Sequence, residues 1–381
     1  MKYTEPKIDL LKTTNKININ HDEKADDIGA VIVDTFNSFG IEVDISEYKC
    51  SPINIIFELR LRKTARYKDI KACEEDLSVC LGRVVKVFQR SETSNVFSVS
   101  VLRYMREYVA LRDLIDNSKF KKAKSNLYAA VGIDEHGDEY YLDLEQAPHL
   151  LISGTTGSGK TILMDDIIVS ILYRSSPLEV NFVLIDPEGK DFNSYAGLPH
   201  LLCPVVKNTK NAVEIVEYLC SYMSSTFDMF SDVGAKDIDT YNSKVVGSLP
   251  RIVVAIDKYY DFVNEKSKRF EDCLFELSRK GRAAGIHLII NTQSARSDVI
   301  SGNIKANISC RAALSSLDWR ESKAMLDKTG AQKLLGNGDL LITMSNAQIP
   351  SHVQTAYISE AEIDSIVRDI RKNNIVNMGD R

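Results

Sequence analysis

The stretch Gly154–Thr161 has the sequence GTTGSGKT and decides which fold the chain is predicted to adopt. An apolar run, Leu150–Ser153, precedes it and predicts a buried strand, and Ile162–Leu172 follows with a helix-like pattern. A segment of the form GxxxxGKT between a strand and a helix is typical of a phosphate-binding loop. Its glycines allow positive φ angles, so successive backbone N–H groups can turn inward toward phosphate oxygens. The sequence therefore predicts a nucleotide-binding P-loop.

This loop predicts ATP and Mg²⁺ as cofactors. Lys160 should reach the β- and γ-phosphates, and the Thr161 hydroxyl should bind the metal ion. The helix that follows adds partial positive charge at its N-terminus. The predicted nucleotide-binding residues are Gly154, Thr155, Thr156, Gly157, Ser158, Gly159, Lys160 and Thr161.

A P-loop also needs an acidic side chain at the end of another buried strand to hold the metal ion. Asp257, which ends the apolar run Ile252–Ile256, is the first candidate, and Asp186 is the second. The next residue is Lys258, where hydrolytic sites usually carry an acid. An ammonium group cannot accept a proton from the attacking water, and that assistance is typically worth about 10²–10⁴-fold in rate. Lys258 could instead pair with Asp257 or with a phosphate, which would preserve nucleotide binding without turnover.

From residue 149 onward, short apolar strands alternate with helical stretches. This alternation predicts an α/β fold with a mostly parallel sheet covered on both faces. Upstream, alternating and helical patterns predict a small α+β domain. We therefore predict a flexible leader over residues 1–27, the small domain over 28–125 and the larger domain over 126–381.

Composition narrows the possible functions. The chain has 381 residues, with 48 basic and 53 acidic side chains and a net charge of -5. This balance argues against a protein that binds nucleic acid with its whole exterior, although local basic loops remain compatible with it. Seven cysteines without a CxxC spacing argue against a zinc site. No apolar run is long enough to span a bilayer, so we expect a cytoplasmic protein without a membrane span of its own.

Several further segments resemble a known family. PHLLISGTTGSGKT, GLPHLLCPVV, RIVVAID, RAAGIHLIINTQ, SDVISGNIKANI and LLGNGDLL are similar, in order and spacing, to the motor of the FtsK/SpoIIIE family of double-stranded DNA translocases. PKIDLLK, FGIEVDI, EEDLSVCLG and YVALRDLIDNSKF resemble the small α domain that precedes that motor. The resemblance implies a RecA-like P-loop ATPase that forms a homohexameric ring and moves double-stranded DNA through it. No segment resembles the membrane anchor or the C-terminal winged-helix module of the cell-division members, so we expect neither.

The resemblance also implies roles for individual residues. Arg282 matches an arginine finger that acts on the neighbouring subunit's nucleotide, with Arg279 as a competitor. Gln293 matches a sensor of the γ-phosphate. The predicted catalytic residues are thus Lys160, Asp257, Arg282 and Gln293.

Two loops resemble the family's pore loops, which would grip DNA phosphates without reading sequence. Lys236 and Tyr241 lie in VGAKDIDTYN, and Lys305 lies in SDVISGNIKANI with Arg296 just before it.

Four departures from the family pattern leave alternatives open. Besides Lys258, they are Ser225 and Thr226 in place of two arginines, Ser294 and Ala295 in place of Arg-Pro, and Glu188 in place of the lysine of a DPK motif. The first hypothesis is an ATP-driven DNA translocase. The alternative is a nucleotide-binding but hydrolysis-poor ring or adaptor that regulates another motor. A pump for protein substrates is the third.

Overall fold

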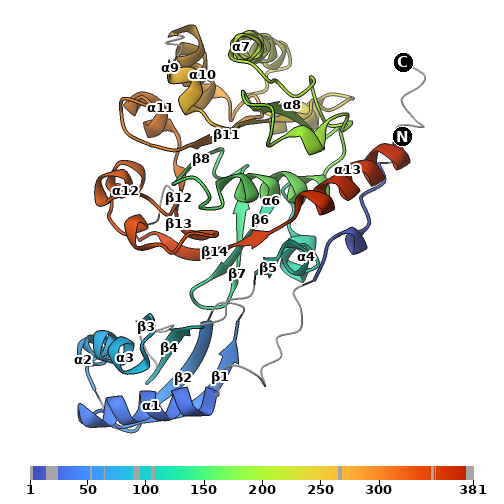
Figure 1. Ribbon diagram of the computed structural model, residues 1–381. Helices are drawn as coiled ribbons and strands as arrows, with labels where there is room; N and C mark the ends of the chain where they lie inside the picture. Colours follow the sequence, from blue (N-terminus) through green and yellow to red (C-terminus); the bar gives the residue numbers. More distant parts are fainter. Residues whose placement is uncertain are drawn as a thin grey trace. The chain divides into compact units, whose positions relative to one another are not determined.

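The computed structural model divides the chain into two compact units (Figure 1). The larger unit comprises Met1–Thr13, Ala110–Gly132 and Glu139–Arg381, and the smaller comprises Thr14–Val109 and Ile133–Asp138. The structure describes residues 3–13, 25–51, 54–63, 65–88, 95–103, 108–264, 268–344, 347 and 349–374.

A ten-stranded mixed sheet forms the centre of the larger unit, in the order β7-β6-β14-β13-β12-β8-β11-β10-β9, with β5 pairing to β14. Its strands are β5 (Val109–Ala110), β6 (Tyr128–Asp134), β7 (Glu139–Asp143), β8 (His149–Ser153), β9 (Val180–Ile185), β10 (Arg251–Ile256), β11 (Ile286–Thr292), β12 (Cys310–Leu314), β13 (Asp339–Thr343) and β14 (Ser351–Tyr357). The five strands β12-β8-β11-β10-β9 run parallel. β13 and β14 extend them in antiparallel fashion. The predicted α/β class is confirmed, and the parallel strands end at one common edge.

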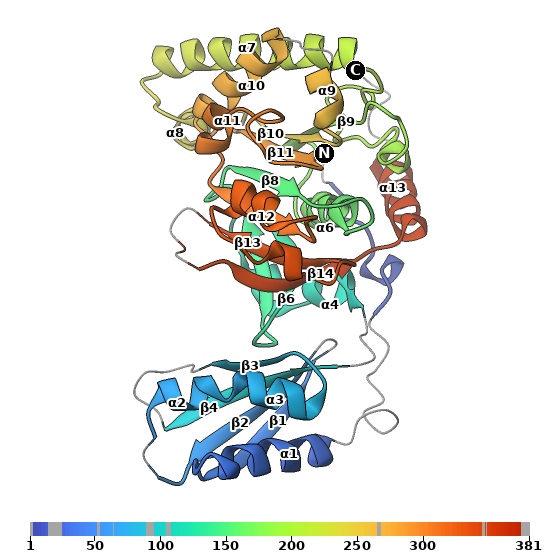
Figure 2. The same ribbon diagram turned by 60° about the vertical axis from the view of Figure 1, so that its left-hand side comes forward.

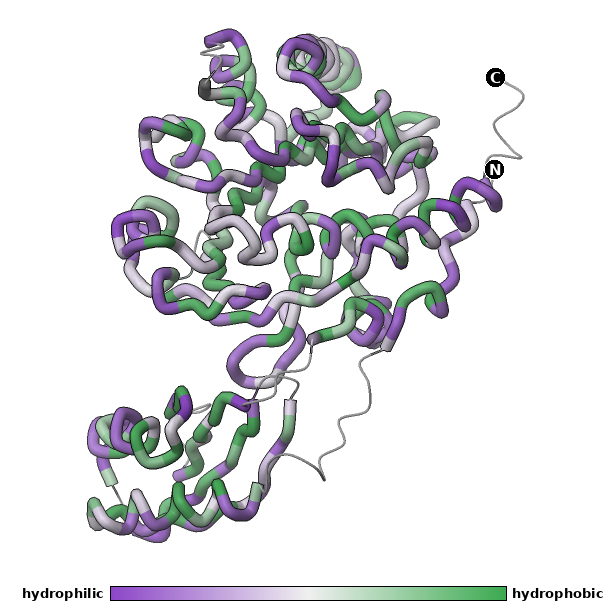
Figure 3. The backbone as a smooth tube through the Cα atoms, in the orientation of Figure 1, coloured by the Kyte–Doolittle hydropathy of each residue, from purple (hydrophilic) through white to green (hydrophobic). Residues whose placement is uncertain are grey.

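Helices cover this sheet and bury its apolar strands. They are α4 (Leu111–Ile115), α5 (Ser118–Lys122), α6 (Lys160–Leu172), α7 (Thr209–Asp232), α8 (Ile238–Lys244), α9 (Tyr260–Asn264), α10 (Lys268–Lys280), α11 (Gly302–Asn307), α12 (Trp319–Leu326) and α13 (Glu360–Asn374), with 3-10 turns at Ile8–Leu10, Asn193–Tyr195 and Ala331–Lys333. α7 and α10 pack against each other beside the sheet (Figure 2). Val216 of α7 and Leu274 of α10 join Val254 and Leu288 of the strands in one buried cluster. The colouring by hydropathy is green along these central strands (Figure 3).

The smaller unit is an antiparallel four-stranded sheet with helices, in the order β1-β2-β4-β3. Its elements are α1 (Ala25–Ser38), β1 (Val43–Cys50), β2 (Asn54–Leu61), α2 (Tyr67–Ala72), α3 (Glu74–Leu81), β3 (Val85–Phe88) and β4 (Val96–Leu102). Ile32 and Phe36 of α1 pack with Phe57, Leu77 and Val99 in its core. The predicted small α+β domain is therefore present.

The unit boundaries differ from the predicted ones. Where the sequence pattern predicts a flexible leader, residues 3–13 lie along α6 and α13 of the larger unit. The Tyr3 hydroxyl donates to the Leu172 carbonyl at 3.0 Å, and the Lys12 amide donates to Glu362 Oε1 at 2.8 Å. Leu11 is buried. Residues 110–125, predicted to end the small domain, also belong to the larger unit. The rest of the predicted leader, up to residue 24, lies outside the described residues.

Candidate nucleotide-binding site

The predicted P-loop joins β8 to α6 and is tied to neighbouring segments by backbone hydrogen bonds. The Thr155 amide donates to the Ser315 carbonyl at 2.8 Å, and the Gly338 amide donates to the Ser158 carbonyl at 2.8 Å. Gly159 has a φ of 108°, and a Cβ atom there would lie 2.9 Å from the backbone nitrogen of Gly338. Only glycine fits such a position without moving the neighbouring chain.

Lys160 and Thr161 begin α6 at the inner end of this loop. The Lys160 ammonium donates to the carbonyls of Gly154 at 2.8 Å and Thr155 at 2.9 Å. Burial lowers the pKa of Lys160, an effect that the charge of Asp257 opposes. The first turn of a helix offers free backbone N–H groups and partial positive charge. The loop thus combines the donors and the cation that a polyphosphate requires.

Asp257 lies at the common carboxyl edge of the parallel strands, directly after β10, and is fully buried. The Asn291 side-chain amide donates to Asp257 Oδ1, while Oδ2 has no hydrogen-bond partner among the described residues. Burial raises the pKa of Asp257 to about 7, with the neighbouring Asp191 carboxyl as the next cause. A buried carboxylate oxygen without a donor is costly unless a cation or another donor binds it.

Two further carboxylates from the loop after β9 meet Asp257. Oxygens of Asp186, Asp191 and Asp257 lie within 4.8 Å of one another. Asp186 Oδ2 accepts from the amides of Asp191 at 2.7 Å and Phe192 at 3.3 Å, which fixes the loop. Asp186 Oδ1 is buried and has no partner among the described residues. Carboxylate oxygens are ligands that Mg²⁺ prefers, so this set fits a magnesium ion. Both predicted acidic candidates therefore lie at one site.

Lys258 pairs with this acidic loop. Its Nζ lies 2.6 Å from Asp191 Oδ2 and 3.0 Å from Glu188 Oε2. Burial alone would lower the pKa of Lys258, but the bonds to Asp191 and Glu188 outweigh it, so the pKa lies above its usual value and the group stays charged. Its backbone φ of 53° lies in the left-handed region, which a non-glycine residue adopts at a cost.

The remaining catalytic candidates lie on both edges of the sheet. Gln293 is exposed directly after β11, between the P-loop strand and the Asp257 strand. Arg282 is exposed before β11, at the amino edge of the parallel strands. There it lines a pocket of about 550 Å³ with Lys236, Arg251 and Arg279. Within one chain, Arg282 and the P-loop therefore lie at opposite ends of the parallel strands.

The other predicted DNA-contacting side chains have protein partners. The Tyr241 ring faces Phe230 with centroids 5.2 Å apart. Arg296 Nε lies 2.7 Å from a carboxylate oxygen of Glu321. The Lys305 ammonium donates to the Ala324 carbonyl at 2.7 Å. None of these three lines the basic pocket that contains Lys236.

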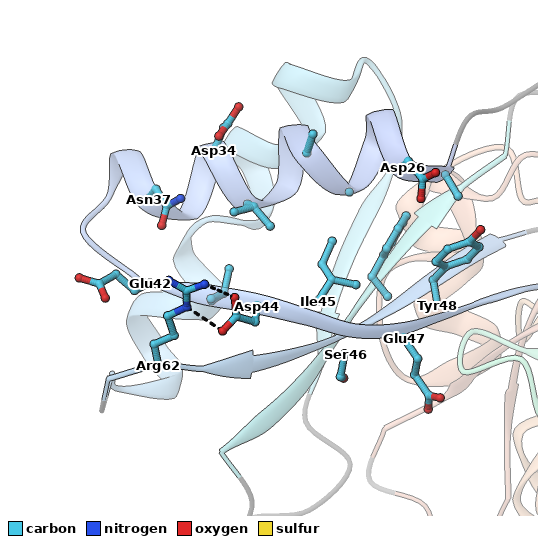
Figure 4. A pocket seen from close by; sticks show the side chains of 16 residues that line it. Asp26, Asp34, Asn37, Glu42, Asp44, Ile45, Ser46, Glu47, Tyr48 and Arg62 are labelled. Atoms are coloured by element: carbon cyan, nitrogen blue, oxygen red, sulfur yellow. Dashed lines mark hydrogen bonds and ion pairs between the residues drawn. The ribbon is translucent and has the colours of Figure 1, made fainter.

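A larger pocket in the smaller unit is unsuited to a nucleotide. It encloses about 710 Å³ between α1 and β1, and acidic side chains dominate its charged lining (Figure 4). Its one lining arginine, Arg62, already donates from Nε to Asp44 Oδ2 at 2.6 Å. Like charge would repel phosphates from this pocket.

Sequence reasoning did not single out Asn291 or Asp191. Asn291 stands near the end of the apolar strand IHLIINT, and a polar residue there, beside the strand that ends in Asp257, is a signal that could have been used. Asp191 lies in an irregular loop, and its approach to Asp257 depends on the turn closed by Asp186.

Known proteins place the chain in a family. Residues 110–297 match the FtsK/SpoIIIE family, and residues 6–101 match the FtsK alpha domain. A DNA translocase FtsK of Caldanaerobacter subterraneus subsp. tengcongensis is 36% identical over 374 residues, which cover 98% of this chain and 53% of that protein. A DNA translocase FtsK of Listeria monocytogenes is 34% identical, covering 88% of this chain and 46% of that protein. The chain spans about half the length of these relatives.

A solved structure shows the same fold. The pCW3 conjugation coupling protein TcpA, in its monomer form with ATPγS, aligns with a TM-score of 0.61 and 19% identity, over 90% of this chain and 99% of that one. The RecA-like P-loop fold predicted from the sequence is thereby confirmed. None of the described helices combines the length and the apolar character that a bilayer crossing requires. With matches to both family domains in their expected order, the chain belongs to the FtsK/SpoIIIE family.

Proposed function

We propose that this chain is an ATP-hydrolysing motor that moves double-stranded DNA through a ring of six copies. The observation that carries the proposal is one site in which a complete P-loop faces a buried, incompletely bonded acid. The charge of Asp257 raises the pKa of Lys160, against the larger effect of burial, although β11 lies between their strands. The names of the relatives supply the substrate, because both are DNA translocases and this chain matches about half of each.

The residues would divide the work as follows. Lys160 would leave the carbonyls of Gly154 and Thr155 and bond to the β- and γ-phosphates, where charge-assisted hydrogen bonds are stronger. Thr161 and Asp257 would hold Mg²⁺, which would supply positive charge to neutralise the charge that develops during phosphoryl transfer. Gln293, exposed at the same edge, would contact the γ-phosphate.

The position of Arg282 supports an arrangement in which the ATP-binding sites form between neighbouring subunits. It lies at the amino edge of the sheet, whereas the P-loop lies at the carboxyl edge. A ring in which the amino edge of one copy meets the carboxyl edge of the next would bring Arg282 to a neighbour's nucleotide. An arginine finger supplied in this way is worth about 10³–10⁵ in rate.

DNA would contact exposed cations by its phosphates. Lys236 is exposed in the turn between α7 and α8 and is the best placed of the four candidates. Arg296, Lys305 and Tyr241 would have to exchange their present partners for DNA. Contacts to phosphates release counterions, so binding should weaken steeply with salt.

The test is steady-state ATP hydrolysis by the full chain with and without long linear duplex DNA. We expect hydrolysis that DNA stimulates, and its loss in Lys160→Ala. A chain that binds MgATP but does not hydrolyse it with DNA present would contradict the proposal and favour the hydrolysis-poor alternative. DNA binding measured between 50 and 200 mM salt separates a DNA motor from a protein pump, because only the former should show the steep decline.

A further inference from the structure

A lysine and an acid at this site stand in the opposite order from the one that the family resemblance implies. The family resemblance implies a lysine at position 188 and an acid at position 258, whereas this chain has Glu188 and Lys258. The two side chains are bonded to each other, with 3.0 Å between Lys258 Nζ and Glu188 Oε2. The two departures from that resemblance are therefore in direct contact, as an ion pair between the two loops.

The same lysine holds a carboxylate beside the metal-binding acids. Lys258 Nζ lies 2.6 Å from Asp191 Oδ2, so the ammonium fixes the position of this carboxylate. Lys258 also has left-handed backbone, with φ 53°, which a non-glycine residue adopts at a cost. Strained backbone of this kind concentrates at functional sites.

Asp191 differs from its two acidic neighbours in its access to solvent. Asp186 and Asp257 are fully buried, and each has one oxygen without a partner among the described residues, as metal ligands would. The Asp191 side chain is 27% exposed, although its oxygens lie within 4.8 Å of theirs. Of the three acids, it alone is accessible to solvent, so a water molecule can reach it beside the oxygens that would hold the metal ion.

We propose that Asp191, held in place by Lys258, is the carboxylate that orients the attacking water, in place of the acid that the family pattern puts at position 258. The inference rests on the proposed hydrolysis of ATP at this site. The water oxygen bonds to the γ-phosphorus, and the bond to the β–γ bridging oxygen breaks with its electron pair remaining on ADP. Asp191 accepts the water proton and passes it to the released phosphate. Asp191 is thus a catalytic residue and Lys258 a positioning residue.

The experiment compares Asp191→Asn with Glu188→Gln, because both acids bond Lys258 but Glu188 lies outside the group of three. DNA-stimulated kcat, binding of a fluorescent ATP analogue and the Mg²⁺ concentration for half-maximal binding are measured for each. We expect Asp191→Asn to lower kcat by about 10²-fold or more with both binding constants unchanged. Glu188→Gln should lower kcat less than tenfold. Unchanged kcat in Asp191→Asn would overturn the inference, as would a raised Mg²⁺ requirement, which would make Asp191 a metal ligand.

Substitutions of Lys258 test its positioning role. Lys258→Arg should keep most of kcat, because a guanidinium can bond both acids, whereas Lys258→Met should lower kcat with an unchanged melting temperature. Lys258→Glu should lower kcat further, because it adds a like charge beside Asp191 and Glu188. If the natural chain is silent while Lys258→Glu hydrolyses ATP, both the inference and the proposed motor function are wrong. If the natural chain is active and Lys258→Glu is faster, only the inference is wrong.

Discussion

Asp165 offers a direct test of whether a buried carboxyl group in the P-loop helix is protonated at neutral pH. It lies in α6, is buried, and accepts a hydrogen bond from the Tyr195 hydroxyl at 2.8 Å. Burial raises the pKa of Asp165 from 3.8 to about 8, more than the bond from Tyr195 lowers it. The folded chain therefore keeps this proton at neutral pH, whereas the unfolded chain loses it.

The direction in which pH changes the stability of the fold follows from this difference in pKa. Between pH 3.8 and about 8, ionisation of Asp165 stabilises only the unfolded chain. The contribution of the protonated residue to the stability of the fold is therefore complete below pH 3.8 and is lost as the pH rises through that range. Each pH unit amounts to about 1.4 kcal/mol, which gives an upper limit on the order of 4 kcal/mol at pH 7. Asp165→Asn removes this loss and keeps an oxygen that can accept from Tyr195. We expect the variant to be more stable than the natural chain at pH 7 and above.

Urea unfolding at pH 5, 6, 7 and 8 measures the effect. The advantage of Asp165→Asn in free energy of unfolding should grow with each step in pH. Asp228→Asn is the matched control, because Asp228 is exposed on α7, and it should give no such trend. An advantage that is independent of pH, or a variant less stable at pH 8, would refute the reasoning.

Three further outcomes are expected. Gly159→Ala should weaken ATP binding at least tenfold in an equilibrium titration, because its φ of 108° and the 2.9 Å approach to Gly338 force the loop to shift; near-normal binding would contradict this. Asn291→Leu should lower the free energy of unfolding by about 1–3 kcal/mol, because it removes the donor to buried Asp257, and added Mg²⁺ with ATP should recover part of that loss. Arg282→Ala and Lys160→Ala should each abolish ATP hydrolysis, whereas a mixture of the two should regain some, since mixed rings pair an intact P-loop with an intact Arg282. A mixture that does not hydrolyse ATP would count against ATP sites that are shared between subunits.

The P-loop and the parallel strands could be predicted because their signals are local. GTTGSGKT predicts a glycine-rich turn between a strand and a helix, and short β-branched apolar runs such as RIVVAID are typical of buried strands. Asp257 could be placed for the same reason, since strand ends in a parallel sheet share an edge.

Features that depend on irregular backbone could not be predicted. Asp191 reaches Asp257 through a loop whose path is set by hydrogen bonds to Asp186, and no periodicity encodes that path. The polar composition of residues 1–27 predicts a flexible leader, yet several hydrogen bonds to α6 and α13 fix the segment around Leu11. The ion pair from Lys258 to Glu188 joins positions 70 residues apart, so each substitution alone looked like a loss of function.

The bonds from Lys160 to its own loop bear on how the protein could complete a cycle. Because Gly154 and Thr155 already satisfy this ammonium, a nucleotide gains only the difference between two sets of hydrogen bonds when it displaces them. The loop carbonyls thereby compete with the phosphates for Lys160. This competition limits the affinity for nucleotide and leaves the ammonium hydrogen-bonded when a product dissociates. In the proposed motor, which must release its nucleotide in every cycle, this competition favours turnover over tight binding.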